Sequence, residues 1–222
     1  MVLEQESGPI NSEQKDLLNK GYQSNERMIT LINDLLNVSR IEEGKFKYVF
    51  KKVDFGKVIS EVVDEFKEEI KMRKIVFSFQ KESREIPKVK VDLEKIRLVI
   101  ENLIDNAIKY TPENGKVQIV LRRKEDKIEV EVADTGVGIP ADQQKQLFSK
   151  FFRGRNVIRM QTDGSGLGLF IARNIVLKHG GNIWIESEEG KGTRAYFILP
   201  VAEKFTVPEK REEDYEKFIT GF

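Results

Sequence analysis

The stretch DTGVGIP, residues 134–140, joins a carboxylate to two glycines at alternate positions. A single segment of this kind is weak evidence, because acidic turns that contain glycine are common and most of them only reverse the chain. Here the stretch lies between NLIDNAIKYT, residues 102–111, and GSGLGL, residues 164–169. Three such segments in this order indicate a shared site.

Length, charge and cysteine content limit the classes of protein to be considered. The 222 residues allow one sizeable core with an appendage. Lysine and arginine total 38 against 37 aspartate and glutamate residues, so we expect no general attraction to nucleic acid or acidic lipid. Cysteine is absent, which excludes disulfides and thiolate metal sites and fits a reducing cytoplasm. No apolar run approaches the roughly 20 residues that span a bilayer, so we expect no membrane segment in this chain.

A long amphipathic helix is predicted between Asn11 and Glu42, where apolar residues recur at three- and four-residue steps. These residues are Leu17, Leu18, Met28, Leu31, Ile32, Leu35, Leu36, Val38 and Ile41. Asn11 or Ser12 can cap its start, and Gly44 follows its last periodic residue. A helix of roughly 30 residues is about 45 Å long, which exceeds the needs of a compact domain. It can fold back on the core, but we favour a helical hairpin or an intermolecular bundle.

After Gly44, short apolar runs alternate with helical ones, which is typical of a mixed α/β layer. Strands are expected at residues 47–53, 74–80, 116–124, 127–134, 182–188 and 193–199. Asp54 and Asp92 are expected to cap two helices between the strands, and a third begins in GSGLGL. The short turn at residues 125–126 makes its hairpin antiparallel. The predicted fold class is α+β: a long helix followed by a two-layer α/β sandwich, in which helices cover one face of a mixed sheet.

Three regions follow from this pattern. We expect a helical domain at residues 1–44, an α/β domain at residues 45–200 and a tail at residues 201–222. Four apolar residues of the tail share one helical face, so the tail can dock as a helix or stay loose. They are Tyr215, Phe218, Ile219 and Phe222.

Asn102, Asn106 and Lys109 lie on one stripe of the helix that Asp92 caps, because four and three residues separate them. The amide oxygens suit Mg²⁺, which prefers oxygen ligands and substrate phosphates, and Lys109 can reach a phosphate oxygen. Taken alone, this helix favours a structural interpretation, in which Asn106 satisfies a backbone group and Lys109 extends into solvent.

Asp134 ends a predicted strand, where its carboxylate can accept a hydrogen bond from an exocyclic amine such as that of adenine. Gly136 and Gly138 allow close approach of a flat ring or a positive φ, although a simple hairpin turn has the same composition. GSGLGL stands at a helix N-terminus, where exposed amides and the helix dipole favour an anion. It lacks the Gly-Lys-Ser/Thr of a P-loop, and no strand immediately precedes it.

Residues 140–164 have the composition of a mobile lid. We expect Phe148, Phe151 and Phe152 to anchor a helix within this segment. Arg153 and Arg155 can add positive charge near a terminal phosphate, although arginines on a surface loop are more often only solvated.

Together these motifs resemble the C-terminal part of bacterial sensor histidine kinases, whose ATP-binding class also includes DNA gyrase and MutL. NLIDNAIKYT resembles the N box, DTGVGIP the G1 box and LFSKFFR the F box. GSGLGLFIARNIVLKHGG resembles the G2 box with its helix, and EGKGTRAYFILP the last glycine motif. The resemblance covers residues 12–200. It implies a Bergerat-type ATP-binding fold at residues 45–200, with ATP and Mg²⁺ as the cofactors.

The resemblance also implies roles for single residues. Asn106 is expected to be the Mg²⁺ ligand, with Asn102 as its helper and Lys109 as a phosphate contact. Tyr110 is expected to stack on adenine, and Asp134 to accept a hydrogen bond from its amine.

Further nucleotide contacts are expected around these residues. Gly136 and Gly138 would shape the purine pocket, and Thr193 would support Asp134 through water. The other expected contacts are Ile139, Phe152, Gly164, Ser165, Gly166, Leu167, Gly168 and Leu169. Arg153 is expected to act in catalysis beside Asn102, Asn106 and Lys109.

DNA gyrase and MutL carry a glutamate where Asn102 stands, and that glutamate activates water. An amide cannot act as a general base, so Asn102 favours phosphoryl transfer to a residue over hydrolysis, with catalysis by positioning and electrostatics. The family's acceptor is a histidine on the first helix of a dimerising hairpin. The one histidine here, His179, fits a helix C-terminal cap instead.

Residues 12–42 resemble the second helix of that dimerisation and phosphotransfer hairpin, and residues 1–10 resemble the loop before it. We therefore expect the acceptor to lie upstream, in a chain that is a fragment. The expected partners are a response-regulator receiver domain and the missing acceptor helix or a second protomer, bound as a homodimer through the 12–42 helix. The expected location is the cytoplasm, including the cytoplasmic portion of a membrane-bound sensor. Two alternatives stay open: a nucleotide-binding regulatory module without kinase activity, and a serine kinase.

Overall fold

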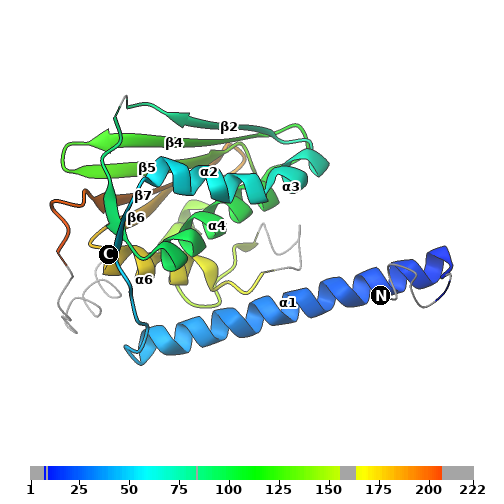
Figure 1. Ribbon diagram of the computed structural model, residues 1–222. Coiled ribbons are helices and arrows are strands. Elements are labelled where there is room, and N and C mark those ends of the chain that lie inside the picture. The colour runs from blue at the N-terminus through cyan, green and yellow to red at the C-terminus, as the bar shows by residue number, and fades with distance from the viewer. Residues whose placement is uncertain (1–7, 9, 84, 156–163, 207–222) are drawn as a thin grey trace. The chain divides into compact units, whose positions relative to one another are not determined.

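The computed structural model describes residues 8, 10–83, 85–155 and 164–206 (Figure 1). Contacts divide the chain into two units. The first contains Met1–Phe46 with Asp163–Ser165, and the second contains Lys47–Thr162 with Gly166–Phe222. Each unit is described by itself. The predicted tail helix and residues 156–163 of the predicted lid lie outside the described residues.

The first unit consists mainly of α1 (Ser12–Glu42), which confirms the predicted long helix. Asn11 caps it by accepting a hydrogen bond from the Gln14 N–H, and the Gln14 side chain accepts one from the Asn11 N–H. The large apolar side chains of α1 are mostly exposed. They are Leu17, Leu18, Tyr22, Met28, Ile29, Leu31, Ile32, Leu35 and Leu36. Within the described part of the chain, no helix combines the length and the apolar character that crossing a bilayer would need.

The second unit is built on a five-stranded sheet with the order β2-β4-β5-β7-β6. Its strands are β2 (Val76–Lys81), β4 (Lys116–Lys124), β5 (Lys127–Asp134), β6 (Asn182–Glu188) and β7 (Gly192–Pro200). β2 pairs with β4 in parallel, and the other neighbouring pairs are antiparallel. The helices α2 (Phe55–Glu65), α4 (Leu93–Tyr110) and α6 (Gly168–Lys178) cover one face (Figure 1). The predicted two-layer sandwich with a mixed sheet is therefore confirmed.

Aliphatic side chains fill the space between the sheet and the helices. α4 contributes more of them than any other element, and its buried residues are Ile96, Val99, Ile100, Leu103, Ile104, Ala107 and Ile108. Burying one large aliphatic side chain contributes about 1.5–3 kcal/mol, so this helix is fixed firmly. The predicted caps are confirmed, since Asp54 accepts a hydrogen bond from the Lys57 N–H and Asp92 accepts one from the Lys95 N–H.

Two expected strands begin later than predicted. β1 (Lys51–Val53) covers only the last residues of the range 47–53, because its partner β3 (Val89–Val91) offers three residues for pairing. β3 itself was not predicted. β2 begins at Val76 because Lys74 ends the turn after α3 (Lys67–Met72) with a φ of 54°.

The helix expected around Phe148, Phe151 and Phe152 was wrong. A 3₁₀ helix, η1, covers Ala141–Gln146, and turns follow it through Phe151. Phe151 has a φ of 60° and is 63% exposed, so it cannot anchor a helix against the core. A left-handed residue interrupts helical hydrogen bonding, which explains the difference.

Candidate functional site

The polar stripe of α4 is present as predicted, and its three residues differ in their contacts. The Asn102 amide donates to the Leu98 carbonyl at 2.7 Å. The Asn106 side chain makes no hydrogen bond with another described residue. The Lys109 ammonium pairs with the Asp105 carboxylate at 2.5 Å, one turn earlier on the same helix. Lys109 is therefore held along α4. Sequence reasoning missed this pair, although its four-residue spacing is a signal for it.

The start of α6 lies directly against Asn102. A Cβ atom on Gly168 would stand 2.1 Å from the Asn102 side-chain oxygen, so only glycine permits this approach. Leu167, fully buried, fixes the backbone at the helix start. α6 has no side-chain cap, whereas aspartates cap α2 and α4. Its first amides are thus available to an anion, and the positive end of the helix dipole favours one.

The other residues of the GSGLGL segment are divided between the two units. Gly164 and Ser165 group with the first unit, in which the Ser165 hydroxyl donates to the Asp34 carboxylate at 2.6 Å. In the second unit, Gly166 has a φ of 69° and packs closely on the backbone of Phe151 and Phe152, while Leu169 lies in the first turn of α6.

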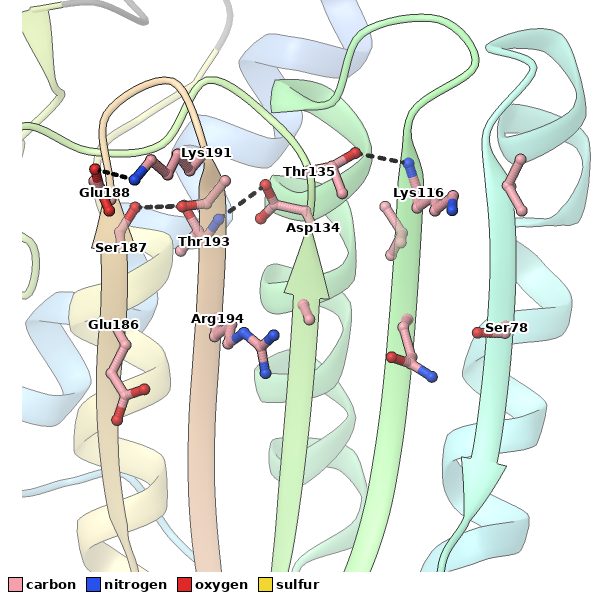
Figure 2. Close-up of a pocket in the computed structure, with 15 residues that line it drawn as sticks. Ser78, Lys116, Asp134, Thr135, Glu186, Ser187, Glu188, Lys191, Thr193 and Arg194 are labelled. Carbon is pink, nitrogen blue, oxygen red and sulfur yellow. Dashed lines mark hydrogen bonds and ion pairs between the residues drawn. The ribbon is translucent and has the colours of Figure 1, made fainter.

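Asp134 ends β5 with a half-buried carboxylate. Its Oδ1 accepts hydrogen bonds from the N–H group of Gly136 at 2.8 Å and from that of Thr193 at 3.2 Å, the latter drawn in Figure 2. Burial raises the pKa of Asp134 to about 6, and the two backbone bonds only partly oppose this effect. Its Oδ2 makes no hydrogen bond with another described residue and can accept one from an exocyclic amine.

Thr193 supports Asp134 in a way that the sequence did not predict. Its backbone N–H contacts the carboxylate directly, and its hydroxyl lies 3.0 Å from the Ser187 hydroxyl (Figure 2). Ser187 in turn accepts a hydrogen bond from the Ile139 N–H at 2.9 Å. These bonds join the DTGVGIP segment to β6 and β7. The water-mediated role of Thr193 stays a prediction.

Two glycines allow the DTGVGIP segment to pack where it does. A Cβ atom on Gly136 would stand 2.4 Å from the Tyr110 carbonyl oxygen, at the end of α4. Gly138 has a φ of 63°, and a Cβ atom there would stand 2.0 Å from the Glu188 carbonyl oxygen. The predicted positive φ is present at Gly138, and the close approach of a flat ring stays a prediction. The close packing of Gly136 brings Asp134 near the C-terminal end of α4.

Aromatic and cationic residues lie near the same end of α4. Tyr110 is largely buried, which raises the pKa of its hydroxyl, and the positive charge of Arg153 opposes this effect. Arg155 pairs with Asp142 at 2.5 Å, and its N–H donates to the Gln143 side chain. Arg155 is therefore paired with a carboxylate, as Lys109 is.

A cavity of about 530 Å³ lies beside Asp134 (Figure 2). Of the predicted nucleotide contacts, only Asp134 and Thr193 line it. Ala133 and Arg194 are next to these two residues along β5 and β7, so their side chains face away from the helices. Gln118, Glu186 and Ser78 belong to the same row of paired residues across the sheet and also line the cavity. This cavity belongs to the uncovered face of the sheet, whereas Asn102, Asn106 and the start of α6 lie on the helical side.

Comparisons with known proteins identify the family. Residues 91–203 match the model of the histidine kinase-, DNA gyrase B- and HSP90-like ATPase family. The sensor histidine kinase WalK of Bacillus subtilis (strain 168) is 35% identical over 194 residues, which make up 86% of this chain and 30% of WalK. The chain thus spans about a third of the length of this relative.

Solved structures of similar proteins include two that match most of this chain. Full-length ShkA in complex with AMPPNP is 25% identical with a TM-score of 0.74, over 93% of this chain and 42% of ShkA. Histidine kinase ThkA in complex with the response regulator protein TrrA is 28% identical with a TM-score of 0.69, over 90% of this chain and 55% of ThkA.

Replacing Asp134 with asparagine should stabilise the ligand-free protein and weaken nucleotide binding. Because the pKa rises from 3.8 to about 6 on folding, the wild-type carboxyl favours the folded state at low pH and loses this contribution as the pH rises through about 6. The full pKa difference of Asp134 corresponds to roughly 3 kcal/mol in the free energy of unfolding. At neutral pH, Asp134→Asn should therefore unfold at a higher temperature than the wild type.

The same variant should bind AMPPNP at least about tenfold more weakly, the usual effect of losing a hydrogen bond to a charged group. The asparagine oxygen would keep the two backbone bonds, and its NH₂ group would then face the adenine amine. Calorimetric titration and thermal unfolding, each at several pH values, measure both effects. Equal affinity would show that Asp134 does not contact the base.

Gly138→Ala should destabilise the protein more than Gly190→Ala. Both glycines have a positive φ, 63° and 81°, which costs an alanine about 1–2 kcal/mol. Only at Gly138 would the new Cβ also meet a backbone carbonyl, since nothing lies within 4 Å at Gly190. Gly138→Ala should also lower nucleotide affinity, and Gly190→Ala should not. Equal denaturation midpoints for the two variants would contradict the close approach of Gly138 to Glu188.

Proposed function

Since the chain belongs to the histidine kinase-, DNA gyrase B- and HSP90-like ATPase family, we propose that it is the ATP-binding catalytic core of a two-component sensor histidine kinase. In this proposal it transfers the γ-phosphoryl group of ATP to a histidine imidazole, and ADP leaves. A response-regulator aspartate then receives the phosphoryl group from the histidine. The observation that carries the proposal is the packing of the uncapped start of α6 on Asn102 of the polar α4 stripe.

On the helical side of the sheet, different residues can bind the adenine and the phosphates of ATP. Asp134 selects adenine by accepting from its amine, and Tyr110 stacks on the ring. The amides at the start of α6 hold phosphate oxygens, with Gly164, Ser165 and Gly166 in the segment that precedes them. Phosphate draws Lys109 away from Asp105, because a multiply charged anion attracts the ammonium more strongly than one carboxylate does.

The amide oxygens near the phosphates fit Mg²⁺. Asn106 is the proposed ligand, with Asn102 as its helper, because amide oxygens and phosphates suit this hard cation. Bound Mg²⁺ would neutralise charge on the phosphates during transfer. Arg153 would add positive charge near the transferred group. Asn102 cannot take a proton from water, which favours transfer to a residue over ATP hydrolysis.

His179 is not the phosphoacceptor in this proposal. It is fully buried, and both of its ring nitrogens are engaged. The acceptor histidine therefore comes from outside these 222 residues, on a hairpin helix that pairs with α1. A receiver domain is the proposed second partner, by analogy with the ThkA–TrrA complex. The cytoplasm, which supplies ATP, is the proposed location.

The alternative is a nucleotide-binding regulatory module without kinase activity. The observation that favours it is the burial of the single histidine. Such a module would bind ATP and act on partner kinases, so the two functions differ in what happens to the γ-phosphate.

Supplying a separate acceptor hairpin should separate these functions. The purified chain with [γ-³²P]ATP and Mg²⁺ should retain no label, and a hairpin from a similar histidine kinase should gain acid-labile, base-stable phosphate. Asn106→Asp should abolish the transfer, because a new negative charge faces the phosphates. An unlabelled hairpin with normal ATP binding would support the regulatory module, and acid-stable label would indicate a serine kinase.

The exposed apolar stripe of α1 should cause self-association or binding of an added hairpin. Leu35→Glu should weaken this association by about tenfold or more, because it places a charge where roughly 1.5–3 kcal/mol of apolar burial is expected. Met72→Glu is the matched control, since Met72 is also exposed but lies on α3. Sedimentation equilibrium measures the effect. A monomer at every concentration, with no added hairpin bound, would contradict an interface on α1.

A further inference from the structure

His179 is fully buried at the C-terminal end of α6 and uses both ring nitrogens. Its Nδ1 lies 2.7 Å from the Ile175 carbonyl oxygen, and its Nε2 lies 3.0 Å from the Asp92 backbone nitrogen. A backbone N–H can only donate, so Nε2 accepts and the ring proton is on Nδ1. Burial lowers the pKa of His179, which keeps the ring neutral, as these two bonds require.

Asp92 connects His179 to two other segments. It is 5% exposed and caps α4 by accepting a hydrogen bond from the Lys95 N–H through Oδ1 at 3.1 Å. Its other oxygen, Oδ2, accepts a hydrogen bond from the Val49 N–H at 2.7 Å. One aspartate thus joins the end of α6, the start of α4 and the segment that enters the second unit.

The entering segment is held by further contacts. Tyr48 and Phe50 pack edge-on against the His179 ring, with centroids 5.7 and 5.1 Å away. The ring of Phe50 also packs against the ring of Phe205, with the two centroids 4.7 Å apart. Immediately afterwards, β1 pairs with β3, which runs directly into Asp92. Residues 48–53 are therefore attached to the second unit by backbone pairing, aromatic contacts and the Asp92 carboxylate.

The hydrogen bonds of Asp92 do not involve the nucleotide residues. Asn102, Asn106 and Lys109 occupy the later turns of α4, whereas Asp92 precedes its first turn. Before the entering segment in the sequence, Gly44 has a φ of 64° in the turn after α1. The boundary between the two units falls between Phe46 and Lys47.

We infer that His179 and Asp92 are positioning residues that lock the entering segment, residues 48–53, to the start of α4. Gly44 and Lys45 donate backbone hydrogen bonds to the carbonyls of Ile41 and Arg40 at the end of α1, so the lock leaves residues 46–47 as the hinge between the unit that contains α1 and the unit that contains the proposed ATP site. This inference rests on the proposed function for its catalytic consequence, since phosphoryl transfer requires the acceptor hairpin to meet the ATP site in a defined geometry. Loss of the lock should slow the transfer and leave ATP binding unchanged.

Val49 provides a test that leaves both positioning residues in place. Its side chain is 65% exposed, so Val49→Pro removes little except the N–H that donates to Asp92. Val49→Ala is the matched control, because it shortens the same side chain and keeps the N–H. His179→Phe removes the acceptor for the Asp92 N–H but keeps a ring, and His179→Gln restores an acceptor oxygen.

Amide hydrogen exchange on the whole chain reports on the lock without phosphoryl transfer. Val49→Pro and His179→Phe should speed the exchange of residues 50–53 by about tenfold, the usual effect of losing one buried hydrogen bond on an opening equilibrium. His179→Gln should recover part of the protection, and Val49→Ala should match the wild type. Unchanged exchange in Val49→Pro would overturn the lock, even if His179→Phe failed to fold.

The transfer assay with the added hairpin tests the catalytic consequence. Val49→Pro should lower kcat several-fold with an unchanged KM for ATP. A rise in KM with constant kcat would overturn the positioning role, because the network would then only support the nucleotide site. Absence of transfer in the wild type would count against the proposed function, whereas the exchange result would still decide whether the lock exists.

Discussion

The packing of α4 on the sheet, with α6 beside it in the same layer of helices, is the constraint on which the site depends. Most of its apolar residues are buried, so the helix cannot rotate without exposing several of them. Its remaining stripe must then present Asn102, Asn106 and Lys109 together. The same packing brings Gly168 against Asn102 and Gly136 against the carbonyl of Tyr110. The helix therefore fixes the distance between the proposed phosphate-binding and adenine-binding ends of the candidate site.

Much of this arrangement could be predicted, because its signals are local. Apolar periodicity and aspartate caps predict α2 and α4, and the glycine spacing predicts the turn at Gly138. The missed features depend on distant partners or on single backbone angles. β3 is three residues long and pairs only because β1, about forty residues earlier, lies beside it. The left-handed Phe151 breaks a helix that composition favours. Asp92 looks like an ordinary cap in the sequence, and its bond to His179 spans 87 positions.

Two features of the candidate site oppose its local stability. Burial opposes the charge of Asp134, and α6 begins without a side-chain cap. Each feature has a counterpart in the proposed ligand ATP: an amine for the carboxylate, and phosphate oxygens for the amides. Departures from local stability of this kind are expected where a fold serves a ligand. The site is thus organised at some cost to the stability of the free protein.

β6 lies at the edge of the sheet, where unpaired backbone groups can recruit a strand from another molecule. Gln144 of η1 uses one NH₂ group to donate to the carbonyls of Ile139 and Ser187, at 3.0 and 2.8 Å. η1 therefore covers part of this edge. A change that breaks these two bonds would uncover β6, so the hydrogen bonds of one side chain contribute to the resistance of the protein to aggregation.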